Sequence, residues 1–410
     1  MPRVILTLSL AVALGLPAVA RDWPQFFGPN RNGVYDGPPL SETWGPRGPS
    51  VVWRKAVGQG LSGPVVAGGK VVLFHRVANR EVVEALDAAT GGTLWEYGYP
   101  TTYRDDFGFD EGPRAVPVVA DGIVYTVGAQ GQLHAVDLET GKRVWSVDTQ
   151  ARYQVPKNFF GTGGSPLVED GRVIANIGGA GAGIVAFDAK TGDVLWTATD
   201  HPASYSSAAS ATINGVRDAV FLTRTGLVGL DPSTGAVRFE QRWRARSASS
   251  VNAATPIIVD NTIFVSAEYG PGAGLLRVNG TQLSPLWASD EVLSNHYATS
   301  VYRDGYLYGY HGRQEFGPSL RAVEFRTGTV MWSEEQFRAG SILLAGNRLL
   351  ILREGGELVL AEATPEAFRP LARAQILPPT VRAYPALADG LLYVRNDDTL
   401  VCLDLRPSRP

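Results

Sequence analysis

One eleven-residue pattern, Ala-x-Asp-x-x-Thr-Gly-x-x-x-Trp, recurs along this chain and limits what the chain can fold into. Its copies end, in chain order, at Trp95, Trp145, Trp196, Phe239, Trp287 and Trp332. The first three copies are complete, and the later ones are looser or degraded. A repeat of fixed period predicts a fold built from similar units, each of which buries its apolar face against its neighbours.

A second pattern, offset from the first, consists of two apolar runs separated by a two-residue turn. The turns are Gly68-Gly69, Asp121-Gly122, Asp170-Gly171, Asn214-Gly215, Asp260-Asn261, Asp304-Gly305, Gly346-Asn347 and Asp389-Gly390. Such pairs accept the positive φ that tight hairpins require. Because each unit has room for about four short strands, we predict an all-β fold. The eight turns make it an eight-bladed β-propeller of four-stranded antiparallel blades.

The two ends of the repeat region predict how the ring closes. The last unit, residues 384–404, lacks an outermost Trp strand, whereas an orphan strand around Trp53 precedes the first unit. We expect this N-terminal strand to complete the last blade, because closure removes a free sheet edge that would promote aggregation. Within each repeat, we expect the Asp to accept hydrogen bonds from turn amides, the Gly to supply a positive φ and the Trp to pack between sheets.

The start of the chain predicts export. Arg3 precedes an uncharged apolar run, and Ala18-Val19-Ala20 has the small residues of a cleavage site, which together indicate a secretory signal peptide. The run is short for a membrane span, no later segment is apolar enough, and no cysteine at the cleavage point could carry a lipid. We therefore expect a periplasmic or secreted protein. The assignment is a signal peptide over residues 1–20, a turn-rich extension over 21–50 and the propeller over 51–405.

The composition limits the kinds of partner that the chain is expected to bind. The net charge is −3 and no half of the chain is strongly basic, which argues against a nucleic-acid partner. The single cysteine, Cys402, precludes an intramolecular disulfide, and its apolar neighbours predict an inert core thiol. We expect a monomer.

The repeat copies and their turns resemble the PQQ-like β-propeller repeat family over roughly residues 50–405. That family includes quinoprotein dehydrogenases and the non-catalytic, outer-membrane assembly factor BamB. The segment from Trp23 to Gly33 is similar to the Trp-Pro-x-x-x-Gly-Pro-x-Arg-x-Gly opening of many exported members from environmental bacteria. We expect this segment to form a plug or lid across the propeller, and a direct ligand contact through Trp23 or Arg31 is the alternative.

The resemblance also marks what this chain lacks. Quinoprotein dehydrogenases typically place a vicinal cysteine pair over the cofactor and are considerably longer, whereas this chain has one cysteine. No position here matches their calcium ligands. The resemblance therefore favours binding over catalysis.

Long loops join the blades on one face, and functional residues usually lie on loops held by a rigid scaffold. We expect the channel rim to consist of the residues just before each innermost strand: Gln59, Arg114, Thr162, Tyr205, Asn252, His296, Arg338 and Arg382. We expect added aromatic surface from Tyr103, Tyr153, Phe159, Phe160, Trp243 and Tyr297. Three rim arginines favour an anionic ligand, since a guanidinium suits carboxylate or phosphate. The alternative is that these polar side chains only line a water-filled channel.

The remaining motifs give weaker support for a functional site. The weak candidates for a metal site are Asp105, Asp106, Asp110 and Glu111. Calcium prefers such oxygen ligands, but a solvated acidic loop paired with Arg104 and Arg114 is the reading we favour. The glycine run at residues 178–183 leads into a strand, so it is no nucleotide loop. The run of residues 242–246, Arg-Trp-Arg-Ala-Arg, favours anion or protein binding. Neither a His-Glu-x-x-His nor a Gly-x-Ser-x-Gly motif occurs.

Three functions remain in view. The leading one is an exported, non-catalytic binding or scaffold propeller of the cell envelope, with a protein or a small anionic ligand on the long-loop face and no cofactor. The alternative is a quinoprotein oxidoreductase that binds PQQ and calcium in the central funnel. A hydrolase or lyase acting on polysaccharide would need paired carboxylates at the funnel, and the repeat positions place none there.

Overall fold

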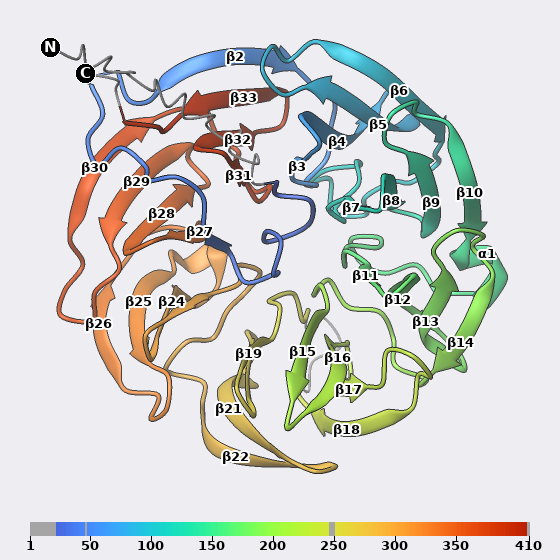
Figure 1. The fold of residues 1–410 in the computed structure, drawn as a ribbon. Coiled ribbons are helices and arrows are strands. Elements are labelled where there is room, and N and C mark those ends of the chain that lie inside the picture. Colours follow the sequence, from blue (N-terminus) through green and yellow to red (C-terminus); the bar gives the residue numbers. More distant parts are fainter. Residues whose placement is uncertain (1–21, 46, 246–250, 408–410) are drawn as a thin grey trace, which may run out of the picture.

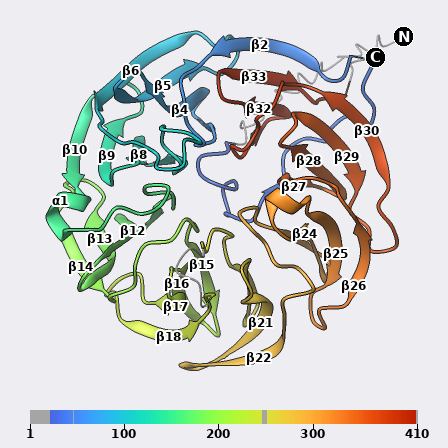
Figure 2. The same cartoon turned by 180° about the vertical axis from the view of Figure 1, so that it is seen from behind.

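The computed structural model describes residues 22–45, 47–245 and 251–407, which form a closed ring of eight β-sheets around a central channel (Figures 1 and 2). Each sheet holds four antiparallel strands, and a fifth strand joins one sheet. The predicted eight-bladed propeller is confirmed. The expected signal peptide, residues 1–20, lies outside the described residues. Within the described ranges, no helix has the length and apolar character needed to cross a membrane.

The first four blades follow the chain from the channel outward. Their strands are β3 (Val65–Ala67), β4 (Lys70–Val77), β5 (Arg80–Asp87), β6 (Thr93–Pro100), β7 (Val118–Ala120), β8 (Ile123–Val127), β9 (Gln132–Asp137), β10 (Arg143–Asp148), β11 (Leu167–Glu169), β12 (Arg172–Gly179), β13 (Ala182–Asp188), β14 (Val194–Ala198), β15 (Ala209–Ile213), β16 (Val216–Leu222), β17 (Gly226–Leu230) and β18 (Val237–Arg242). A five-residue helix, α1 (Thr149–Tyr153), follows β10.

The next blades repeat this order. Their strands are β19 (Ile257–Val259), β20 (Thr262–Ala267), β21 (Gly272–Asn279), β22 (Gln282–Ser289), β23 (Val301–Arg303), β24 (Tyr306–His311), β25 (Ser319–Glu324), β26 (Val330–Glu334), β27 (Gly340–Ala345), β28 (Arg348–Arg353), β29 (Glu357–Glu362), β30 (Pro370–Gln375), β31 (Ala386–Ala388), β32 (Leu391–Arg395) and β33 (Thr399–Asp404). A short 3-10 turn, η1 (Gln314–Phe316), lies between β24 and β25.

The predicted two-residue turns all connect the first and second strands of a blade. Asp121 has a φ of 50° and Gly122 a φ of 75°, the left-handed pair that a tight hairpin needs. At Asp260-Asn261 and Gly346-Asn347, only the first residue has a positive φ. The glycine run is the hairpin between β12 and β13, in line with the strand predicted after it.

The N-terminal strand closes the ring as predicted. Strand β2 (Ser50–Ala56) pairs antiparallel with β33 as the outermost strand of the eighth blade, with Trp53 opposite Cys402 (Figure 1). Cys402 is fully buried, and burial raises the pKa of its thiol to about 12. The sequence did not predict β1 (Val34–Tyr35), which adds a parallel fifth strand to the seventh blade beside β27.

The repeat tryptophans join six of the eight blades to the next blade in the ring. Trp95 in the first blade donates its indole N–H to the carbonyl of Leu138 in the second, at 2.9 Å. Its ring lies over Gly141, where a Cβ atom would come within 2.7 Å of the ring. The same donation is made by Trp53, Trp145, Trp196, Trp287 and Trp332 to the carbonyls of Ala88, Ala189, Pro232, Phe325 and Thr364. The predicted packing of these rings between sheets is therefore confirmed.

The repeat aspartates hold the turns that receive these rings. Asp137 accepts hydrogen bonds from the backbone N–H and the hydroxyl of Thr140, at 2.8 and 2.6 Å. These bonds lower the pKa of Asp137, with the threonine hydroxyl as the largest cause. Asp87 bonds Thr90 in the same way. The aspartate thus fixes the turn whose glycine leaves room for the ring of the preceding blade.

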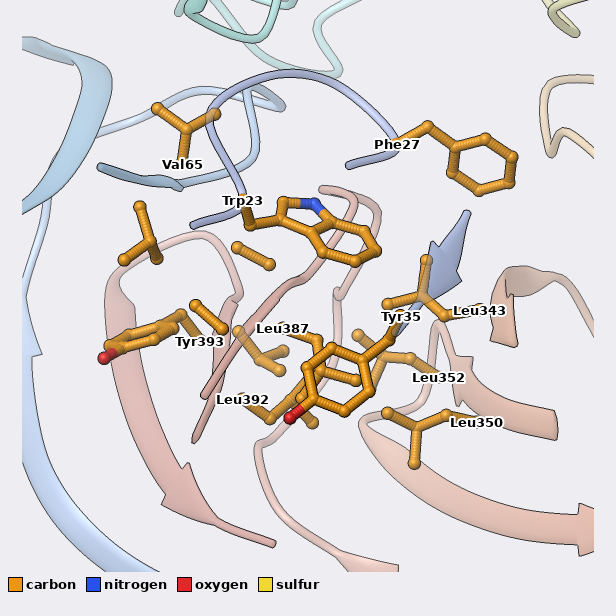
Figure 3. Packing of buried hydrophobic residues seen from close by; sticks show 14 of the residues in the cluster. Trp23, Phe27, Tyr35, Val65, Leu343, Leu350, Leu352, Leu387, Leu392 and Tyr393 are labelled. Atoms are coloured by element: carbon orange, nitrogen blue, oxygen red, sulfur yellow. The ribbon is translucent and has the colours of Figure 1, made fainter. Parts of the chain in front are cut away.

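The segment that begins at Trp23 crosses the channel as the expected plug. Trp23 pairs with Val66 of β3 in both directions at 2.9 Å, and the carbonyl of Pro24 accepts from Val119 of β7. At its other end the carbonyl of Gly33 accepts from Leu344 of β27. Figure 3 shows the Trp23 and Phe27 rings of this segment among side chains of the first, seventh and eighth blades. The plug is therefore hydrogen-bonded to the first, second and seventh blades.

Gly141→Ala tests the blade-to-blade docking. The new methyl group would meet the Trp95 ring, so we expect an overpacking cost of about 1–3 kcal/mol in addition to the strain of a positive φ. Gly122→Ala is the matched control, because its φ is also positive and nothing lies within 4 Å of the added Cβ atom. Thermal unfolding should show a clearly larger loss for Gly141→Ala, and equal losses would refute the docking role of the ring.

Candidate functional site

A funnel-shaped cavity of about 330 Å³ lies in the channel on the side of the long loops. Its wall includes Phe26 of the plug, so the plug bounds the cavity from within the channel. The Phe26 ring packs edge-on against Tyr384 with 4.8 Å between ring centroids. The plug therefore forms part of the wall of the cavity.

The segments that enter the innermost strands supply most of the wall, and they do so with alternate residues. The pairs are Arg114 and Val116, Gly163 and Ser165, Tyr205 and Ser207, Val251 and Ala253, and Arg382 and Tyr384. In extended backbone, residues two apart point to the same side. Each of these entry segments thus presents two side-chain positions to one cavity.

The mouth of the funnel is aromatic. Phe109 is 62% exposed, and its ring centroid lies 6.2 Å from that of Phe160. Phe160 in turn packs against Tyr205 at 5.7 Å and donates its backbone N–H to the Tyr205 hydroxyl at 2.9 Å. Phe107, half exposed, completes this group at 5.1 Å from Phe160. A contiguous exposed apolar patch is a feature of surfaces that bind a partner or a ligand.

Glu354 lies behind the funnel wall and accepts hydrogen bonds from three of the polar side chains in that wall. Its carboxylate accepts from the Tyr297 hydroxyl at 2.7 Å, from Arg382 Nε at 2.8 Å and from Gln314 Nε2 at 3.1 Å. Burial and the nearby carboxylate raise the pKa of Tyr297 well above its ordinary value. The tyrosine therefore stays protonated and acts as the donor.

His296 is held in one tautomer. Its Nδ1 accepts the backbone N–H of Gln314 at 3.3 Å, which leaves the proton on Nε2, 3.0 Å from the Tyr269 hydroxyl. Burial lowers the pKa of His296, and the neighbouring Glu315 opposes that shift only in part. The imidazole is thus neutral and is hydrogen-bonded at both of its ring nitrogens.

Arg114 is also committed to partners. Its guanidinium lies 3.6 Å from Asp105, donates to the carbonyls of Gly112 and Asp110, and stacks 5.6 Å from the Tyr103 ring. This matches the expected pairing of the acidic loop with Arg114.

The other carboxylates of the loop are engaged too, and that of Asp110 accepts the backbone N–H groups of Gly60 and Gly112. Asp106 pairs with Lys157, and Glu111 with Arg104. No group of three or more His, Cys, Asp or Glu side chains that could hold a metal ion occurs among the described residues.

The serines of the funnel join blades to one another. Ser165 Oγ accepts the backbone N–H of Val116 at 2.9 Å, and Ser207 Oγ accepts that of Ser165 at 3.1 Å. Among the described residues, neither hydroxyl is hydrogen-bonded to a His, Asp or Glu side chain that could activate it as a nucleophile. Their role is to hold the entry segments of adjacent blades in register.

The structure brings together six of the residues expected at the channel rim or on its aromatic surface. The residues that line the funnel are Arg114, Phe160, Tyr205, His296, Tyr297 and Arg382. Thr162 lines a neighbouring hollow of about 180 Å³ instead. Asn252 is buried, and its amide donates to the carbonyls of Thr223 and Trp243. Thr162 is adjacent in sequence to Gly163, and Asn252 to Val251, and these two neighbours do line the funnel. Arg338 is exposed and does not line it.

Trp23 and Arg31 are placed in the plug, and neither lines the funnel. Arg31 is 5% exposed, donates to the carbonyls of Ala208 and Pro166, and keeps Nε on the Gln25 side chain. Burial lowers its pKa to about 10, so it remains charged near neutral pH. The geometry gives both residues structural contacts, with Phe26 as the member of the segment that faces the cavity.

Sequence reasoning missed several wall residues. Tyr384 stands two positions after Arg382, so the alternation of extended backbone could have found it. Phe109, Tyr269, Gln314 and Glu354 come from loops whose paths no repeat position fixes.

Comparison with known proteins identifies the family to which this propeller belongs. A family model of PQQ-like propellers, described as outer membrane protein assembly factor BamB, matches residues 79–334. The chain belongs to the PQQ-like β-propeller family. The BamB structure from Moraxella catarrhalis superposes with a TM-score of 0.63 over 88% of this chain and 99% of that one, at 15% identity. At that identity the likeness shows the fold alone.

Curated relatives fall into two groups. Quinohemoprotein alcohol dehydrogenase ADH-IIG of Pseudomonas putida is 36% identical over 140 residues, which make up 32% of this chain and 18% of that protein. BamB of Yersinia pestis is 21% identical over 252 residues, 58% of this chain and 60% of that protein. The match thus spans under a fifth of the dehydrogenase. PQQ-like propellers therefore include both kinds of relative, and the site must decide between them.

The funnel of this propeller does not fit PQQ with calcium. No tryptophan is among its described lining residues, and two arginines that could meet the acidic groups of the cofactor, Arg114 and Arg382, already pair with Asp105 and Glu354. The described residues offer no cluster of three carboxylates or histidines for the cation.

Glu354→Gln should destabilise the funnel wall. The amide cannot serve as a charged acceptor for Tyr297, Gln314 and Arg382 together, and a buried donor left without its partner costs about 1–3 kcal/mol. Glu362→Gln is the matched control, because Glu362 pairs with the exposed Arg369 in the same blade and such pairs contribute about 0–1 kcal/mol. Thermal unfolding should separate the two variants, and equal small losses would show that the Glu354 cluster is not a stabilising unit.

The lowered pKa of His296 makes part of the stability pH-dependent. Below about pH 6.5 the unfolded chain binds a proton that the folded imidazole resists, so stability is present above that pH and is lost as the pH falls toward the folded pKa. We expect the melting temperature of the wild type to fall more steeply with acidification than that of His296→Gln. Parallel curves for the two proteins would exclude this contribution.

Proposed function

We propose that this chain is a non-catalytic binding propeller of the cell envelope, whose funnel receives an apolar segment of a partner protein on the long-loop face. One observation carries the proposal: the charged groups of the funnel are paired with one another, while its mouth presents aromatic rings. Arg382 pairs with Glu354 and Arg114 with Asp105. Phe109 and Phe160 remain as contact surface.

Such a surface suits protein recognition. Aromatic residues and arginine are enriched at the centres of protein interfaces, where aromatic anchors supply most of the binding energy. General acid–base catalysis would require a group with a pKa tuned to exchange protons at working pH. His296 is instead held neutral and bonded at both nitrogens. The funnel therefore favours recognition over bond chemistry.

Two observations support a location in the envelope. The start of the sequence has the features of a secretory signal peptide. The matched family model and one curated relative are described as an outer membrane protein assembly factor. A rigid ring with varied loops on one face is suited to holding a partner in such a setting.

The alternative is a quinoprotein oxidoreductase with PQQ and calcium in the funnel. It is favoured by the segment that is 36% identical to a quinohemoprotein alcohol dehydrogenase. The wall composition of the funnel argues against it, as does the single cysteine of the chain.

Site-directed photo-crosslinking in the native cells tests the binding role. We replace Phe109 by p-benzoylphenylalanine at the mouth of the funnel, and Leu195 on the outermost strand β14 as a matched exposed control. Both side chains are about half exposed or more, so chance collisions should be similar. A discrete protein adduct at position 109, absent at 195 and weakened by Phe160→Ala, is the expected result. Equal labelling at the two positions would count against the funnel mouth as the contact surface.

Titration with PQQ, with and without calcium, tests the alternative. Specific binding at a hundredfold excess over the dissociation constant stabilises a fold by about 2.7 kcal/mol, which a thermal melt detects easily. We expect no calcium-dependent rise in melting temperature. A rise that Arg382→Gln abolishes would overturn the binding proposal and support the oxidoreductase.

A further inference from the structure

A second cavity of about 330 Å³ lies between the third and fourth blades and shares no lining residue with the funnel. Its described lining residues are Val155, Pro156, Lys157, Asn158, Gly178, Pro202, Ala203, Arg224 and Arg244. They come from the connections before β11 and β15, the β12–β13 hairpin, the β16–β17 turn and the end of β18. We call this cavity the basic hollow.

The basic hollow gathers positive charge without a carboxylate in its wall. Three cations, Lys157, Arg224 and Arg244, are among the described residues that line it, and no Asp or Glu is. Lys157 reaches outward to Asp106, but both side chains of that pair are exposed, and such pairs contribute little. Within the described part of the chain, the buried Nε of Arg244 has no hydrogen-bond partner. Burial and the neighbouring arginines lower the pKa of Arg244.

A buried amide joins the two backbone segments that carry the arginines. Asn252 donates to the carbonyl of Thr223 at 2.7 Å and to the carbonyl of Trp243 at 2.9 Å. These two residues directly precede Arg224 and Arg244. The amide therefore holds these two segments together, and the nearby positive charge of Arg224 is one of the causes, after burial, that lower the pKa of Arg244.

Further contacts orient the first of these arginines. The backbone N–H of Arg224 donates to the carbonyl of Pro202, and its guanidinium stacks over the Phe159 ring at 4.9 Å from the centroid. A stacked guanidinium is preorganised and loses little freedom when it forms a hydrogen-bonded fork with a ligand. Arg224 is thus oriented before any ligand binds.

We propose that the basic hollow is a binding site for a small organic anion, whose phosphate or carboxylate group lies between Arg224, Arg244 and Lys157. Guanidinium forks recognise both groups. Val155, Pro156, Pro202 and Ala203 give the remaining wall an apolar character that suits the carbon body of such a ligand. The site lies outside the funnel, so it stands or falls apart from the proposed function.

Calorimetric titration of the full mature chain with sodium phosphate, and separately with sodium succinate, tests the proposal at constant ionic strength set with chloride. We expect saturable binding of at least one of the two anions. Binding of phosphate alone identifies a phosphorylated ligand, binding of succinate alone identifies a carboxylate ligand, and either result supports the site. Failure of both anions to saturate overturns the proposal.

Matched variants locate the binding. Arg244→Gln should weaken the anion at least tenfold, whereas Arg242→Gln, an exposed arginine two residues earlier that does not line the basic hollow, should change the affinity less than twofold. Without anion, Arg244→Gln should melt at the same temperature as the wild type or higher, because it removes a like-charge contact. Lys157→Gln serves as the second variant if Arg244→Gln does not fold. Unchanged affinity in a folded variant overturns the proposal.

Discussion

The docking of one tryptophan onto the turn glycine of the next blade is the interaction on which the ring depends. The indole N–H reaches a carbonyl of the neighbouring blade, and the ring occupies the place that a Cβ atom would take at the glycine. The contact therefore requires a positive φ, an aspartate that fixes the turn and a tryptophan on the outermost strand. Trp53 extends the same contact across the seam between the eighth and first blades, so closure uses no separate device.

The ring can tolerate departures from this contact. The fourth blade carries Phe239 in place of the repeat tryptophan, and the fifth has no Thr-Gly turn to receive it. There Trp243, four residues further on, donates to the carbonyl of Gly272 and packs with Phe239 in one apolar cluster. Blade contact thus survives loss of the motif because burial of aromatic area does not depend on one hydrogen bond.

Strands, turns and closure were predictable from the sequence because they depend on local patterns, namely φ-permissive pairs and alternating apolar residues. The funnel was predictable only in part. Arg114, Tyr205, His296 and Arg382 were placed in the right register, but a slip of one residue turns a side chain to the other side of an extended segment, as for Thr162 and Asn252. Glu354 was missed because its partners, Tyr297 and Arg382, lie far away in sequence and meet it only through the ring.

The two cavities use charge in opposite ways. In the funnel, arginine and carboxylate are paired before any ligand arrives, so what remains for recognition is aromatic area, whose contribution is nearly insensitive to salt. In the basic hollow, the buried amide of Asn252 bonds the backbone just before each of two arginines, and the described part of the wall contains no carboxylate. Attraction of an anion there would weaken as salt screens it. Asn252, expected at the channel rim, instead bonds the residues that precede two arginines of the other cavity. The propeller thus has two cavities whose linings differ in charge and in aromatic content.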